Sequence, residues 1–243
     1  MNILLLMMGG SGTRFGADIP KQYILIKDVP IFAYILAKYS KMPEIDKIVI
    51  VSHKDWIPYV EEWTEKMGAQ EKVHAVVAGG ATRSESVYNG LSAAATFADK
   101  EDVVLIHDAT HPYVDVEGTK GVIAGVKKYG GATLGQCQYD TVYQMDANRI
   151  LKQVVPRSEI VSGASPEAFT FGAIYDIYTQ STKEELESMT SAGAMALAHG
   201  ITMEVVPANV INLKITYPGD MHLFRLLAES YFFPDEQPDG RNE

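Results

Sequence analysis

Residues 2–16, NILLLMMGGSGTRFG, carry the strongest signal for fold class, because an apolar run passes directly into a glycine-rich loop. Asn2 is the only polar side chain before Gly9, which predicts a first strand buried on both faces. Further strands are expected at 47–52, 73–78, 103–107 and 131–138, and helices at 30–39, 55–67, 84–97 and 117–129. This alternation predicts an α/β fold with a doubly wound, mostly parallel sheet.

Ligands of such sheets bind beyond the carboxyl ends of the strands. We therefore expect the chemistry in the loops that follow Met8, Ala78 and His107.

A hairpin interrupts the alternation. Extended-type runs at 141–145 and 149–155 flank the turn sequence Asp146-Ala147-Asn148. A hairpin is marginally stable alone, so this arm, about 139–157, is expected to pack either on a second subunit or back on its own domain.

The remaining chain completes one expected domain over residues 1–233. A strand at 167–171 precedes helices at 172–180 and 188–199, strands at 203–207 and 212–216, and a last helix at 218–232. Residues 234–243 are polar and are expected to form a disordered tail.

Composition narrows the class of protein. The 243 residues are 47% hydrophobic and carry a net charge of −10, which excludes a disordered chain and disfavours binding to nucleic acid. No apolar run is long enough to span a membrane. Cys137 is the single cysteine and cannot form an intrachain disulfide, so we expect a cytoplasmic protein with Cys137 in a strand core.

The glycine loop carries the sharpest chemical signal. Glycines let the backbone approach a ligand, and a run of free amides forms a site for anions. Arg14 and Lys21 add two positive charges, which favour the triphosphate of a nucleotide. The loop is not a Walker A motif, because it does not end in Gly-Lys-Ser/Thr. It also does not match a dinucleotide-binding loop, which has a small residue at the position of Phe15. A plain glycine turn with two solvated cations is the alternative.

The loop after Ala78 reads Gly79-Gly80-Ala81-Thr82-Arg83-Ser84-Glu85-Ser86 and opens a helix. Ser84 is the expected helix cap, while Ser86 and the loop amides could read the polar edge of a base. Glycine turns with a capping serine are common, so this loop alone is weak evidence.

The loop after the fourth strand reads His107-Asp108-Ala109-Thr110-His111-Pro112. Asp108 could hold Mg²⁺ against phosphate oxygens. A zinc pair formed by His107 and His111 would require a helix, which Pro112 and the preceding strand disfavour, so His107 is interpreted as a structural histidine.

Two late basic residues complete the set. Arg157 follows the hairpin, and Lys214 lies in the expected strand 212–216 among apolar neighbours. Lys in such a strand indicates a polar cleft, with extension into solvent as the alternative.

Together these motifs resemble the cytidylyltransferases that activate polyol phosphates, over about Asn2 to Tyr231. The resemblance is carried by Gly9–Arg14 with Pro20-Lys21-Gln22, Gly79-Gly80 with Arg83 and Ser86, His107-Asp108-Ala109, Arg157, Ser165-Pro166 and Asn212-Leu213-Lys214-Ile215-Thr216.

The resemblance implies a Mg²⁺-dependent transfer of CMP from CTP to a polyol phosphate by a homodimer that exchanges its arms. It implies that the loop wraps the triphosphate, that Arg14, Lys21 and Lys214 act on the phosphates, and that Asp108 holds Mg²⁺. It also implies that Arg157 binds the acceptor phosphate across the dimer interface. The other expected substrate-binding residues are Gly9, Gly10, Ser11, Gly12, Thr13, Gly80, Arg83, Ser86 and Ser165.

Three positions depart from the family pattern near the acceptor. Thr110 and His111 stand where the methylerythritol enzymes usually have Ala-Arg, and Ser191 replaces an Asp of both branches. Residues 53–56, 79–81 and 212–214 look more like the ribitol branch. We therefore expect ribitol 5-phosphate or a related alditol phosphate as acceptor, with 2-C-methyl-D-erythritol 4-phosphate as the alternative.

Two more remote readings remain. One is a nicotinamide-dependent dehydrogenase that uses Gly10 and Gly12 with Asp55 near the ribose. The other is a nucleotide-binding protein without catalytic activity.

Overall fold

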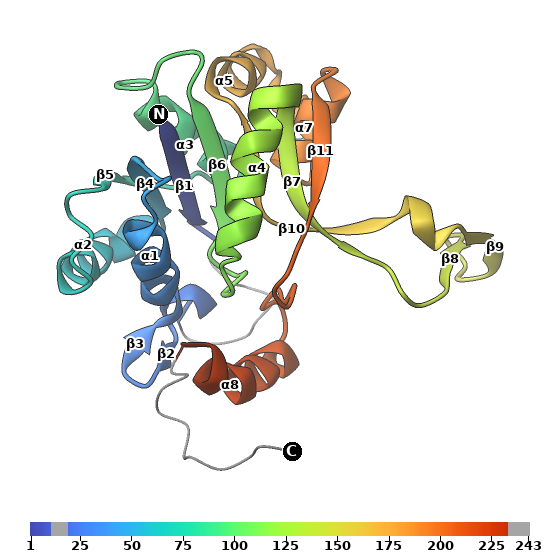
Figure 1. Cartoon of the computed structure of the whole chain (residues 1–243), viewed down its shortest axis with the longest axis horizontal. Coiled ribbons are helices and arrows are strands. Elements are labelled where there is room, and N and C mark those ends of the chain that lie inside the picture. Colours follow the sequence, from blue (N-terminus) through green and yellow to red (C-terminus); the bar gives the residue numbers. More distant parts are fainter. Residues whose placement is uncertain (11–18, 233–243) are drawn as a thin grey trace.

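The sheet has the doubly wound, mostly parallel form that the sequence predicts. The computed structural model describes residues 1–10 and 19–232. Its seven-stranded sheet has the order β11-β7-β10-β6-β1-β4-β5, and only β10 runs antiparallel to its neighbours (Figure 1). The strands are β1 (Asn2–Met8), β4 (Lys47–Ser52), β5 (Val73–Ala78), β6 (Val103–Asp108), β7 (Gly130–Cys137), β10 (Val161–Thr170) and β11 (Thr202–Pro207).

Side-chain alternation along the strands builds two core layers. Leu4 and Leu6 on β1 face one layer, while Ile3 and Leu5 face the other, and all four are fully buried. The first layer packs under α1 (Ile31–Lys41), α2 (Ile57–Lys66), α4 (Val116–Tyr129) and α8 (Pro218–Phe232). The second packs under α3 (Arg83–Ala94), α5 (Phe171–Gln180), α6 (Lys183–Ser188) and α7 (Ala192–Ala198).

The short elements lie near the carboxyl ends of the strands or in the arm. The 3-10 helix η2 (Lys21–Tyr23) and the small pair β2 (Leu25–Ile26) and β3 (Val29–Pro30) follow the glycine loop. Further 3-10 helices in the described residues are η3 (Lys54–Trp56) and η4 (Arg157–Glu159). None of the helices in the described part of the chain is long and apolar enough to cross a membrane.

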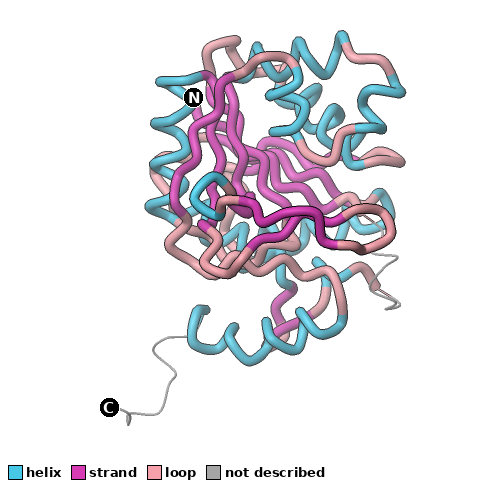
Figure 2. The backbone as a smooth tube through the Cα atoms, turned by 90° about the vertical axis from the view of Figure 1, so that its right-hand side faces the viewer, coloured by secondary structure: helices cyan, strands magenta, loops and turns pink. Residues whose placement is uncertain are grey.

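The hairpin projects away from the body of the protein. Strands β8 (Val142–Met145) and β9 (Leu151–Val155) pair only with each other, and most of their residues are exposed. Figure 1 shows this arm extending to the right of the sheet, and Figure 2 looks onto it from that side. The arm therefore does not fold back on its own domain, and its packing on a second subunit stays a prediction.

Three local predictions are wrong. The helix expected at 188–199 starts later, as α7 at Ala192, because the Ser191 side chain accepts a hydrogen bond from the Ala194 N–H (2.9 Å) and caps it, while α6 is a separate, unpredicted helix over Lys183–Ser188. Residues 211–216 have no regular secondary structure instead of forming a strand. Cys137 is exposed, since it lies at the end of β7 where the sheet emerges from its covering helices. The expected tail, 234–243, lies outside the described residues.

Candidate active site

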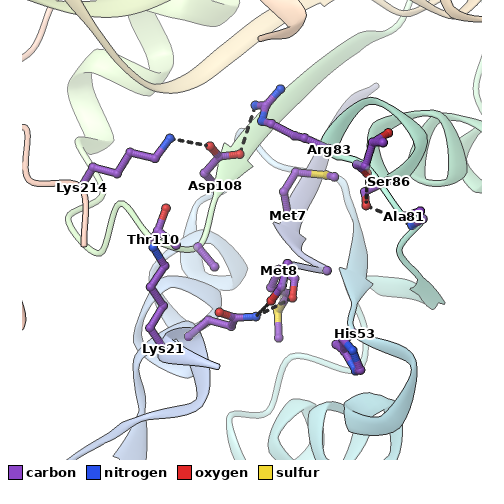
Figure 3. A pocket seen from close by; sticks show the side chains of 16 residues that line it. Met7, Met8, Lys21, His53, Ala81, Arg83, Ser86, Asp108, Thr110 and Lys214 are labelled. Atoms are coloured by element: carbon purple, nitrogen blue, oxygen red, sulfur yellow. Dashed lines mark hydrogen bonds and ion pairs between the residues drawn. The ribbon is translucent and has the colours of Figure 1, made fainter. Parts of the chain in front are cut away.

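A large cavity lies where the sequence predicts the site, at the carboxyl ends of β1, β5 and β6. Its volume is about 520 Å³, and Figure 3 shows side chains from all three following loops around it. The lining residues are Met7, Met8, Gly9, Gly10, Lys21, Gln22, His53, Gly80, Ala81, Thr82, Arg83, Ser86, Asp108, Ala109, Thr110 and Lys214.

Two glycine loops touch at the rim of this cavity. A Cβ on Gly9 would lie 3.1 Å from the Gly79 Cα, so the two backbones approach too closely for a side chain. The Gln22 side-chain amide donates to the backbone carbonyls of Met8 (2.7 Å) and Gly10 (3.0 Å). These two bonds hold the start of the glycine loop in place. Ser11, Gly12, Thr13 and Arg14, which the sequence predicts in this loop, lie outside the described residues.

The start of α3 shapes the second loop. Thr82 caps the helix by accepting from the Glu85 N–H (3.1 Å), and Glu85 completes a capping box. The predicted cap, Ser84, is wrong, because its hydroxyl donates instead to the Leu186 carbonyl (2.6 Å). The Ser86 hydroxyl accepts from Gly80 N–H (3.0 Å) and donates to the Thr82 carbonyl (2.9 Å), so it holds the loop that lines the cavity.

Asp108 lies between two cations in the cavity wall. Its Oδ1 is 3.1 Å from Arg83 NH2, and its Oδ2 is 3.2 Å from Lys214 Nζ (Figure 3). Burial alone would raise the pKa of Asp108, but Arg83 and Lys214 lower it to about 2. The carboxylate is therefore ionised at neutral pH.

Lys21 and Lys214 reach the same cavity from elements far apart in the sequence. The Lys21 side chain donates to the Ile215 carbonyl, and the Ile215 N–H donates to the Thr110 carbonyl (2.8 Å). These bonds hold residues 211–216 against the loop after β6, although these residues form no strand. Lys214 points toward Asp108, as the cleft interpretation predicts, although its side chain stays half exposed.

His107 is a structural histidine, as predicted. It is fully buried, with its Nδ1 2.8 Å from the Tyr39 hydroxyl and its Nε2 2.9 Å from the His111 carbonyl. Burial lowers the pKa of His107 to about 4 and that of His111 to about 3, so both rings are neutral at pH 7. The described residues contain no group of three His, Cys, Asp or Glu side chains that could hold a metal ion by themselves.

The structure brings most predicted site residues together and leaves two apart. Ser165 accepts from the Asp108 N–H (3.4 Å) just behind the cavity wall. Arg157 lies at the base of the arm, where its guanidinium donates to the Tyr139 carbonyl, and it does not line the cavity. The predicted residues that line it are Gly9, Gly10, Lys21, Gly80, Arg83, Ser86, Asp108 and Lys214.

Sequence reasoning missed several lining residues and one residue behind them. His53 follows β4, and the carboxyl-end rule applied to that strand would have found it. Gln22 is next to Lys21 in the sequence, but its hydrogen bonds to the Met8 and Gly10 carbonyls depend on tertiary contacts. Glu167, 3.9 Å from Arg83 NH2, carries no signal in the sequence because it comes from the middle of β10.

The arrangement suits a phosphorylated ligand. A glycine loop, Lys21, Arg83 and Lys214 supply amides and positive charges around one ionised carboxylate. Mg²⁺ typically binds one or two carboxylates together with substrate phosphates, so Asp108 fits such an ion only in company with a phosphate ligand.

Comparisons with known proteins agree with this geometry. The family model described as IspD, 2-C-methyl-D-erythritol 4-phosphate cytidylyltransferase, matches residues 2–231. The enzyme of that name from Clostridium botulinum is 34% identical over 89% of this chain and 94% of its own. A ribitol-5-phosphate cytidylyltransferase from Vibrio parahaemolyticus is 30% identical over 95% of this chain and 97% of its own. The crystal structure of 4-diphosphocytidyl-2C-methyl-D-erythritol synthase from Anaerococcus prevotii has the same fold, with a TM-score of 0.79 at 22% identity, covering 94% of this chain and 96% of that one.

Proposed function

Since this chain belongs to the 2-C-methyl-D-erythritol 4-phosphate cytidylyltransferase family, we propose that it transfers CMP from CTP to a polyol phosphate and releases pyrophosphate. It is a cytidylyltransferase, and hence a nucleotidyltransferase. The observation that carries the proposal is the cavity in which Arg83 and Lys214 flank Asp108 beside the glycine loop and Lys21.

In this reaction an oxygen of the acceptor phosphate attacks the α-phosphorus of CTP in line. The new P–O bond forms as the bond to pyrophosphate breaks, so no covalent enzyme intermediate is needed. The protein's contribution is then orientation and charge stabilisation. We assign Lys21 and Lys214, with Arg14, to the phosphates, and Gly80 and Arg83 to the cytidine side of the cavity.

We propose that Asp108 holds Mg²⁺ together with the triphosphate. Bound there, the ion would neutralise charge on the phosphate oxygens. The low pKa of Asp108 supports this role, because the carboxylate is ready to accept a cation without losing a proton.

For the acceptor we propose ribitol 5-phosphate or a related alditol phosphate. Three segments with ribitol-branch character, 53–56, 79–81 and 212–214, contribute His53, Ala81 and Lys214 to the cavity lining. The second candidate, 2-C-methyl-D-erythritol 4-phosphate, is favoured by the relatives of that name, which reach 34% identity.

One incubation separates the two acceptors. The protein is mixed with CTP, Mg²⁺ and, in parallel, ribitol, methylerythritol, glycerol and other pentitol phosphates, and CDP-linked products are detected by mass spectrometry. We expect product with ribitol 5-phosphate or another alditol phosphate. Product with methylerythritol phosphate alone would replace the first candidate with the second, and CTP binding without any product would indicate a non-catalytic protein.

Lys21→Ala tests the catalytic assignment. Loss of a positioned donor to a developing charge typically costs a factor of about 10² to 10³ in kcat, and we expect a loss of that size. The control is Lys183→Ala on α6, whose exposed side chain pairs with Glu187 and does not line the cavity. Wild-type turnover in a folded Lys21→Ala variant would remove Lys21 from the mechanism.

We propose that the arm forms a homodimer and carries Arg157 to the partner's cavity. Exposed apolar side chains on the arm support this proposal, because such a surface is stabilised by burial against another chain. They are Tyr139, Tyr143, Met145, Ile150, Leu151 and Val154. The position of Arg157 outside its own chain's cavity also supports it. With its single cysteine, the chain suits the cytoplasm, where we propose that it acts.

Subunit mixing tests this arrangement. Arg157→Ala and Lys21→Ala variants should each be inactive, but mixed dimers would contain one site with an intact Lys21 and a partner's intact Arg157. Random exchange of equal amounts should restore about one quarter of wild-type activity. If no activity returns although mixed dimers form, Arg157 does not act across the interface.

A further inference from the structure

The Arg83 guanidinium faces a second carboxylate besides Asp108. Its NH2 group is 3.1 Å from Asp108 Oδ1 and 3.9 Å from Glu167 Oε2. Both oxygens of Asp108 are occupied, since Lys214 takes Oδ2. By contrast, the buried Glu167 Oε2 has no hydrogen-bond partner among the residues that the structure describes.

The other oxygen of Glu167 is firmly anchored. Glu167 Oε1 accepts from the Gly193 N–H (3.1 Å) at the start of α7. A Cβ at Gly193 would lie 2.5 Å from Oε1, so glycine is required for this approach. The start of α7 therefore holds the Glu167 carboxylate in place, with Oε2 left for Arg83.

Burial raises the pKa of the Glu167 carboxyl, and the nearby Arg83 opposes this rise. A buried carboxyl oxygen without a hydrogen-bond partner is costly unless it can be paired. A hydrogen bond from NH2 to Oε2 would form near 3.0 Å, so a shift of about 0.9 Å would bring Arg83 onto Glu167. During this shift the Arg83 guanidinium stays close to a carboxyl group, first that of Asp108 and then that of Glu167. Arg83 therefore has two carboxyl groups within reach as anchors. It is hydrogen-bonded to Asp108, while Glu167 Oε2 has no hydrogen-bond partner in the described chain.

We propose that Glu167 is a positioning residue, the second anchor to which Arg83 moves when a divalent cation takes Asp108. This inference rests on the proposed function, because it assumes that Mg²⁺ and CTP bind at Asp108. A cation at Asp108 repels Arg83, and Glu167 accepts the displaced guanidinium. Asp108 is then free for the cation, while Arg83 keeps its place in the cavity wall.

Calorimetric titration of CTP into the wild type and Glu167→Gln, with and without Mg²⁺, tests the proposal. Gln keeps the shape and the Gly193 bond, but it offers Arg83 no negative charge. We expect CTP affinity without Mg²⁺ to stay within twofold of wild type, and the enhancement by Mg²⁺ to fall about tenfold, the effect of losing one charged hydrogen bond. In an Asp108→Asn background, Glu167→Gln should have no further effect on that enhancement.

Glu44→Gln is the matched control. Glu44 also has a buried oxygen without a partner in the described chain, and its other oxygen lies 3.6 Å from Lys120, away from the cavity. An equal loss of affinity with and without Mg²⁺ in Glu167→Gln, or the same loss of enhancement in Glu44→Gln, would overturn the proposal. Wild-type binding indifferent to Mg²⁺ would also overturn it, but would leave cytidylyl transfer standing. Failure of the wild type to bind CTP at all would refute the proposed function itself.

Discussion

Alanine should act differently at Gly79 and at Gly10, because the first substitution lowers stability and the second lowers ligand affinity. At Gly79 a Cβ would lie 2.9 Å from Ser86 Oγ and 3.0 Å from the Gly9 Cα, well inside the contact distance of about 3.5 to 4.0 Å. The Gly9 atom belongs to the backbone, so the two loops must separate. At Gly10 no atom of the described chain lies within 4 Å of the new methyl group.

The magnitudes decide the sign at each position. Removing glycine stabilises a protein by about 0.4 to 1 kcal/mol through the unfolded chain. Overpacking costs about 1 to 3 kcal/mol, and strain on the bond from Gly80 N–H to Ser86 adds about 1 kcal/mol, so Gly79→Ala should be destabilised by about 2 kcal/mol. For a chain of this size that lowers Tm by about 4 to 8 °C.

Gly10→Ala should melt within about 2 °C of wild type, because it meets no obstacle. Gly10 lines the cavity, however, and its methyl group would stand where a phosphate must approach the backbone. We expect its affinity for CTP with Mg²⁺ to fall at least tenfold in calorimetric titration. The reasoning is refuted if Gly79→Ala melts like the wild type, or if Gly10→Ala binds CTP with unchanged affinity.

Three further predictions concern the ligand-free protein. Burial lowers the pKa of His107 from 6.5 to about 4, so the unfolded state binds the proton first and stability falls as pH drops between these values. His107 alone should cost about 2 kcal/mol between pH 6.5 and pH 5, measurable by urea unfolding, and its NMR signals should stay those of a neutral ring at pH 5. Asp115→Ala removes the cap of α4 and leaves the Asn209 N–H unpaired, so calorimetry should show a loss of about 2 to 4 kcal/mol; a loss below 1 kcal/mol contradicts this. Cys137 should react with a thiol reagent at one equivalent per chain without denaturant, and a protected thiol would contradict its exposed position.

Much of the fold could be predicted because its signals are local. Residues 2–8 and 47–52 are strands with the predicted bounds, since short, nearly continuous apolar runs are typical of strands buried on both faces. The loops after β1, β5 and β6 were predicted as the site, because parallel strands bring their carboxyl ends to one edge. Prediction failed where a single side chain decides, as at Ser191, whose cap starts α7 at Ala192 instead of at the predicted residue 188.

The alternation of strands and helices, the glycine loops and the charged residues beside them can all be recognised in the sequence. Which of these charges pair with one another depends on how the whole chain folds. Arg83 and Lys214 contact the two oxygens of Asp108, although they lie 25 and 106 positions from it in the sequence. Glu167 lies near Arg83 from the middle of a strand. Hydrophobic periodicity reports which face of an element is buried, but side-chain pairing depends on strand order and on distances of a few ångströms, which emerge only when the whole chain packs.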